Sequence, residues 1–279
     1  MSFKTVMMAV ASGLAGGAAV DRAAAIADAL GAHLHLLVVG VAPPPPSSPY
    51  GIVSNDIWAG EIREGQEAAQ GQGEALLEKL GARGVSASVE AQYVDRGTIA
   101  ALSARAARYA DLTLIVPAAE GDDPMQTWVM DGALFESGRP VLLLPPGAQS
   151  FPGAEKVVIA WDASVEASKA VRDGLELMKD AGEVHAVLID PVPSFDGHGP
   201  EPGADLATYL SRHGIRVTVH RLPRQGREVA DIINQTADDL GAGLIVMGGF
   251  GHSRLRQRIF GGTTTTMIRA ARIPVLMAH

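Results

Sequence analysis

The sequence predicts an α/β protein of two similar domains in tandem, each with a five-stranded parallel sheet covered by helices on both faces. Short apolar runs rich in Val, Ile and Leu are typical of buried parallel strands, and they alternate with amphipathic segments typical of helices. This order of elements repeats after about 130 residues, which indicates two like domains rather than a solenoid. We expect the domains to span residues 1–148 and 154–279.

The first half begins with an apolar strand and an amphipathic helix. That helix carries Val20, Ala24 and Ala27 on one face and ends before Gly31, a residue type that often follows a helix. Four glycines lower the helix propensity of the long polar segment after the proline tract that starts at Pro43. In chain order we expect strand 3–10, helix 18–30, strand 34–41, helix 57–80, strand 85–94, helix 98–110, strand 112–116, helix 127–137 and strand 141–144.

The second half repeats that order after a linker. Segments such as Arg139–Leu143 and Ile273–Met277, or Asp111–Val116 and Ala242–Val246, match in residues as well as in position. A Pro/Gly loop lies at 191–202, and four threonines can cap the last helix. We expect strand 156–161, helix 164–179, strand 184–189, helix 204–212, strand 216–221, helix 228–240, strand 244–247, a threonine-capped helix that runs into Ile268 and Ala271, and strand 274–278.

Composition restricts the classes of partner. The chain has 279 residues, of which 47% are hydrophobic and 19% charged, so it can bury substantial cores. A net charge of −8 argues against a nucleic-acid partner. The chain has no cysteine, no membrane-length apolar run and no signal-peptide pattern at its N-terminus, so we expect a cytoplasmic protein without a membrane partner.

The stretch from Leu244 to Ile268 carries the strongest functional signal. A predicted strand ends at Gly248, and a loop with three arginines leads to glycines ahead of the last helix. Such a strand, loop and helix N-terminus favours an anion, most often phosphate, because backbone N–H groups and the helix dipole converge there. The spacing G-x2-G-x9-G, formed by Gly248, Gly251 and Gly261, is neither a P-loop nor a dinucleotide fingerprint. The alternative is a sharp turn without a ligand.

Asp162 follows the first strand of the second half, at the sheet edge where ligands of open parallel sheets bind. Its carboxylate can accept hydrogen bonds from a ribose or an adenine amino group. It can equally cap the following helix, a role for which Ser164 competes.

These residues resemble the universal stress protein family, whose nucleotide-binding loop has the spacing G-x2-G-x9-G followed by Ser or Thr. The resemblance covers nearly all of the second half, and the first half only in the order of its elements. It implies an ATP, ADP or AMP cofactor, with Mg²⁺ as an accompanying ion. It implies that Asp162 contacts the adenosine, and that Gly248, Gly251, Gly261 and Thr263 contact the phosphates. Gly262 replaces the family's hydroxyl residue and offers only its N–H, and Thr264 is the substitute hydroxyl.

The first half departs from this pattern. Ser12 stands where the second half has Asp162, and the acidic residues Glu120, Asp122 and Asp123 follow the fourth strand, where they would repel a triphosphate. We therefore expect a domain that keeps the fold without the nucleotide site. It would pair with the second domain within the chain, through the strands that carry Leu142 and Leu276, and a homodimer is a further expectation.

The sequence supports neither a metal site nor a catalytic residue. His33 and His35 lie on one face of a strand, but no carboxylate close in sequence completes a ligand set. The serines lack a nucleophile elbow. The favoured hypothesis is a stress-response regulator that binds an adenine nucleotide with little or no hydrolysis. The alternatives are a nucleotide-free scaffold for dimer or partner contacts, and a weak adenine-nucleotide hydrolase that uses Asp162 or His252.

Overall fold

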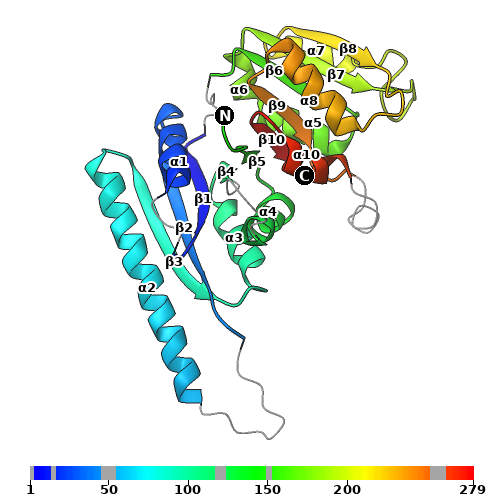
Figure 1. Cartoon of the computed structure of the whole chain (residues 1–279). Helices are drawn as coiled ribbons and strands as arrows, with labels where there is room; N and C mark the ends of the chain where they lie inside the picture. Colours follow the sequence, from blue (N-terminus) through cyan, green and yellow to red (C-terminus); the bar gives the residue numbers. More distant parts are fainter. Residues whose placement is uncertain (1–2, 14–16, 45–54, 117–123, 149–152, 252–261) are drawn as a thin grey trace, which may run out of the picture. The chain divides into compact units, whose positions relative to one another are not determined.

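The computed structural model of the chain describes residues 3–13, 17–44, 55–116, 124–148, 153–251 and 262–279 (Figure 1). Its residues group into two compact units. The first holds Phe3–Ile115 and the helix that precedes Arg139, and the second holds Pro140–His279. The domain boundary between residues 148 and 154 stays a prediction.

The first unit is built on a parallel sheet in the order β3-β2-β1-β4. Strand β1 lies between β2 and β4, with Val6 opposite both Leu34 and Leu112, and these three side chains are fully buried. Burial on both faces explains the unbroken apolar runs. The elements are β1 (Thr5–Ala11), α1 (Ala18–Ala29), β2 (His33–Val41), α2 (Asn55–Ala82), β3 (Ala87–Val94), α3 (Ile99–Arg108), β4 (Leu112–Ile115) and α4 (Pro124–Glu136).

Glycines set how closely the helices of this unit approach. A Cβ on Gly65 of α2 would lie 2.4 Å from the ring of Tyr93 on β3, so the glycine lets the helix lie directly on the sheet. Between α3 and α4, a Cβ on Gly132 would lie 2.0 Å from the carbonyl oxygen of Ala100. Gly65 and Gly132 therefore lower helix propensity but permit close packing.

The second unit has a sheet in the order β5-β10-β9-β6-β7-β8. Five strands are parallel, and β5 pairs antiparallel with β10, with Leu142 opposite Leu276. The elements are β5 (Val141–Leu143), β6 (Lys156–Ala160), α5 (Val165–Asp173), α6 (Leu175–Lys179), β7 (Glu183–Ile189), α7 (Ala204–Arg212), β8 (Val217–Leu222), α8 (Val229–Leu240), β9 (Leu244–Gly248), α10 (Thr263–Ala270) and β10 (Val275–Ala278).

Helices cover both faces of the second sheet. Strand side chains alternate between faces, so Val246 and Met247 point in opposite directions. Gly174, which follows α5, lies against Val246, and Gly203, which precedes α7, lies against Leu188 and Val219. Helix α8 lies on the other face and packs against α10. The sheet order reverses between β6 and β9, because β6 continues to β7 on one side and has β9 on the other. This is the edge where open α/β sheets bind ligands.

The predicted α/β fold class is confirmed, with mostly parallel sheets flanked by helices. One predicted element is wrong in detail, because the helix expected over 164–179 is two helices that meet at Gly174. A Cβ at Gly174 would lie 2.9 Å from Leu276 Cδ2, so a larger residue would not fit where the two helices meet against β10. None of the helices in the described ranges is long and apolar enough to span a bilayer.

Candidate functional site

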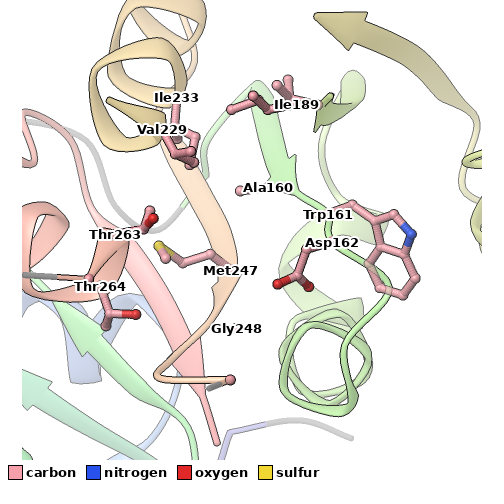
Figure 2. Close-up of a pocket in the computed structure, with 13 residues that line it drawn as sticks. Ala160, Trp161, Asp162, Ile189, Val229, Ile233, Met247, Gly248, Thr263 and Thr264 are labelled. Carbon is pink, nitrogen blue, oxygen red and sulfur yellow. The ribbon is translucent and has the colours of Figure 1, made fainter. Parts of the chain in front are cut away.

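A pocket of about 590 Å³ lies at the reversal point of the second sheet (Figure 2). It is bounded by the ends of β6, β7 and β9 and by the first turns of α8 and α10. Its lining residues are Ala160, Trp161, Asp162, Val187, Ile189, Val229, Ile233, Met247, Gly248, Gly251, Gly262, Thr263 and Thr264.

The pocket has an apolar side and a polar side. Ile189, Val229 and Ile233 form branched aliphatic walls, and Figure 2 shows them together at one end of the site. Thr263 and Thr264 lie at the left of this view, and the carboxylate of Asp162 lies across the site from them, next to Trp161. Such a site fits a ligand with a flat apolar part and an anionic or hydroxyl-rich part.

Ser164, rather than Asp162, caps helix α5. The Ser164 Oγ accepts a hydrogen bond from the Ala167 N–H at 3.1 Å, and Asp162 Oδ1 accepts one from the Ser164 N–H at 3.0 Å. Ala163, between them, has φ 61°, a left-handed conformation that costs a non-glycine residue about 1 kcal/mol. This tight turn holds the exposed Asp162 side chain at the rim of the pocket.

Gly248 is required because backbone approaches backbone. A Cβ at this position would lie 2.6 Å from the Ala167 nitrogen and 2.9 Å from the Glu166 carbonyl carbon, so the end of β9 rests on the first turn of α5. A Cβ at Gly251 would first meet the carboxylate of Glu166, with Oε2 at 3.1 Å. Glycine at these two positions thus lets the start of the loop lie close to the first turn of α5, beside the pocket.

The start of the loop is held by hydrogen bonds from the C-terminal part of the chain. The Gly249 N–H donates to the Ala278 carbonyl oxygen at 2.8 Å, and His279 Nδ1 lies 2.9 Å from the Gly249 carbonyl oxygen. The Phe250 N–H donates to Thr264 Oγ1 at 3.0 Å. Thr264 is only 5% exposed, so this bond links the loop to helix α10 within the unit.

The expectation that threonines cap the last helix is wrong. The N-cap residue of α10 is Gly262, in an extended conformation without a side-chain cap, and the threonines occupy the first turn. The Thr264 hydroxyl instead accepts the loop N–H. The first N–H groups of a helix lack intrahelical acceptors. Together with the dipole, these groups make the α10 N-terminus attractive to an anion in the adjoining pocket.

Six of the predicted site residues line this one pocket: Asp162, Gly248, Gly251, Gly262, Thr263 and Thr264. Gly261, His252 and the arginines at 254, 256 and 258 lie outside the described residues. Sequence reasoning missed the aliphatic walls, Met247 and Trp161. The walls carry no signal of their own beyond lying at the ends of predicted strands and the start of a predicted helix. The ligand contacts assigned to the six residues stay predictions.

The family model that matches this chain and a curated relative carry the same family name. The model of the universal stress protein family matches residues 153–279. Universal stress protein Slr1230 of a Synechocystis species is 29% identical over 143 residues, which is 50% of this chain. The chain covers 46% of that relative, about half its length.

Solved structures extend the likeness in fold to both halves. A universal stress protein from Archaeoglobus fulgidus DSM 4304 superposes with a TM-score of 0.67 at 20% identity, over 98% of this chain and 95% of that one. Protein PA1789 of Pseudomonas aeruginosa PAO1 gives a TM-score of 0.58 at 16% identity, over 99% and 92%. At these identities the likeness concerns the fold alone.

Proposed function

Residues 153–279 belong to the universal stress protein family, and we propose that they bind an adenine nucleotide in the pocket between β6 and β9. The protein would act as a stress-response regulator with little or no hydrolysis. Binding would favour the conformation that holds the ligand, and a protein surface that differs between the free and bound states would report occupancy to a partner.

One observation carries this proposal. The same pocket is lined by branched aliphatic side chains of β7 and α8, by the N-terminus of α10 and by two closely packed glycines, Gly248 and Gly251. An adenine ring fits between Val187, Ile189, Val229 and Ile233, because a flat aromatic base is well covered by aliphatic side chains.

The polar side of the pocket suits the rest of a nucleotide. Asp162 at the rim would accept hydrogen bonds from ribose hydroxyl groups or the adenine amino group. Phosphates would lie against the loop glycines and the first turn of α10, where Thr263 adds a hydroxyl and Gly262 adds its backbone N–H. Mg²⁺ would neutralise part of the phosphate charge beside the Glu166 carboxylate.

The test is calorimetric titration of the full chain with ATP, ADP and AMP, each with and without Mg²⁺. We expect one site per chain. Replacing Gly251 with Asp should lower the affinity by at least about 100-fold, because a new carboxylate would face both Glu166 and the phosphates.

A matched control is Gly182→Asp, which makes the same chemical change on an exposed loop of the same unit. This variant should bind as the unmodified chain does. Unchanged affinity in Gly251→Asp would refute the assignment of the loop. No heat with any of the three nucleotides would refute nucleotide binding and favour the nucleotide-free scaffold.

A further inference from the structure

A chain of titratable side chains connects strand β7 to the edge strand β8 in the second unit. His185 on β7 is only 7% exposed. Its Nδ1 lies 3.1 Å from His220 Nε2 on the edge strand β8, and its Nε2 lies 3.2 Å from Glu183 Oε2. Lys156 Nζ lies 3.4 Å from the other oxygen of Glu183.

The hydrogen-bond partners fix where the protons lie. An ionised carboxylate only accepts, so His185 must donate from Nε2 to Glu183. Neutral His185 then has an unprotonated Nδ1, which must accept the proton of His220 Nε2. One added proton fits on the outer nitrogen of His220 and leaves this chain intact. A second would place two N–H groups face to face over 3.1 Å, between two positive rings.

The first unit carries a related cluster at the equivalent place. His35 is the third residue of β2, as His185 is of β7, and the two lie in register with Ser88 and Thr218 on the edge strands. His35 Nδ1 lies 3.0 Å from Ser88 Oγ, and His33 Nε2 lies 2.8 Å from the same hydroxyl oxygen. Side chains that link the second strand to the edge strand therefore occur in both halves of the chain.

The charged groups that act on these rings come from several elements. Around His35 they are His33 on the same strand, Glu90 on β3 and Arg105 on α3, which pairs with Glu90. In the second unit they are Glu183, Lys156 on β6 and the partner ring. Within the described ranges, no three His, Asp or Glu side chains are arranged to hold a metal ion.

We propose that the cluster of His185, His220 and Glu183 is an acid-sensitive link that holds the edge strand β8 to its sheet at neutral pH and releases it at acid pH. Release of β8 would reach the nucleotide pocket, because Val187 lies in register with His220 and also lines the pocket. Acid pH would then destabilise the conformation that we expect the nucleotide to stabilise. This effect does not require nucleotide binding, although its link to the pocket rests on the proposed function.

The direction of the pH effect follows from proton linkage. Burial lowers the pKa of His35 and of His220 below the ordinary value, and the neighbouring ring lowers that of His220 further. The strand-paired state therefore binds fewer protons than an opened state once the pH falls below about 6.5, the value for a free imidazole. The strand pairing therefore has its full stability above that pH and loses stability below it. The equilibrium constant for opening rises by up to about tenfold per pH unit for each proton taken up.

Hydrogen exchange of the full chain, followed by mass spectrometry at pH 7.5 and 5.5 and corrected for intrinsic rates, tests the proposal. Protection of peptides from β8 should fall at pH 5.5 relative to peptides from the central strand β9 of the same unit. In His220→Gln this fall should be absent, because the Gln side-chain amide still donates to His185 Nδ1 but does not titrate.

His213→Gln is the matched control. His213 lies at the end of α7 against the ring of Tyr209, outside the cluster, and this variant should lose protection as the unmodified chain does. Equal loss in His220→Gln and the unmodified chain would overturn the proposal. If His220→Gln fails to fold, NMR titration of the unmodified chain decides. The pKa of His220 should lie below that of a free imidazole, and a pKa at or above that value would refute the link.

Discussion

Replacing Gly248 with Ala is expected to damage the fold and the pocket together. The new Cβ would lie 2.6 Å from the Ala167 nitrogen, 2.9 Å from the Glu166 carbonyl carbon and 3.0 Å from Glu166 Cβ. Two of these atoms belong to the backbone of the first turn of α5, so rotation of a side chain cannot relieve the overlap. We expect a destabilisation of about 2–3 kcal/mol, the upper part of the range for overpacking. This corresponds to a fall in Tm of about 5–10 °C.

Thermal unfolding followed by circular dichroism measures this effect, and calorimetric titration measures nucleotide affinity in the same preparation. The control is Gly251→Ala, whose Cβ would first meet Glu166 Oε2 at 3.1 Å, the end of a side chain that can turn away. Its Tm should fall by no more than about 2 °C. If Gly248→Ala unfolds within about 1 °C of the unmodified chain, the inferred contact between β9 and α5 is wrong.

Two further substitutions test contacts that the sequence does not reveal. Thr264→Val removes the buried acceptor of the Phe250 N–H and should cost about 1–2 kcal/mol in the free energy of unfolding by urea, with weaker nucleotide binding. Gly132→Ala would place a Cβ 2.0 Å from the Ala100 carbonyl oxygen and should cost about 3 kcal/mol or more. Gly71→Ala, on helix α2 with nothing within 4 Å, should instead stabilise by about 0.5–1 kcal/mol. Equal effects of the two glycine changes would contradict the close packing of α3 and α4.

The fold was largely predictable because its strands are buried on both faces. Runs such as Leu244–Val246 and Val157–Ile159 are apolar at successive positions, and burial in a parallel sheet requires that pattern. The break between α5 and α6 was not predictable, because it depends on Leu276, which lies far along the chain from Gly174. Local propensity carries no information on a neighbour that only the sheet order supplies.

Some residues of the site could likewise be predicted from the sequence, and others could not. Gly248, Gly251 and Asp162 stand out in the sequence because the glycine spacing and a carboxylate directly after a strand are local patterns, although a turn or a helix cap would show the same residues. Val187 and Ile233 are ordinary core residues by sequence, and they become walls of the pocket only because β7 and α8 flank the reversal point. The role of Thr264 was missed for a related reason, since a helix cap and a bond to a distant loop look alike in one sequence.

Strand β5 also bears on how the second unit can be produced and studied in isolation. Its three residues precede the predicted linker, yet they pair with β10. A protein fragment that starts at residue 154 would bare the hydrogen-bonding groups of β10, and bared strand edges recruit other chains. Such a fragment should self-associate through β10. A fragment that starts at Pro140 contains β5, which pairs with that edge of β10. A fragment of this unit should therefore start before β5 if the edge of β10 is to stay paired.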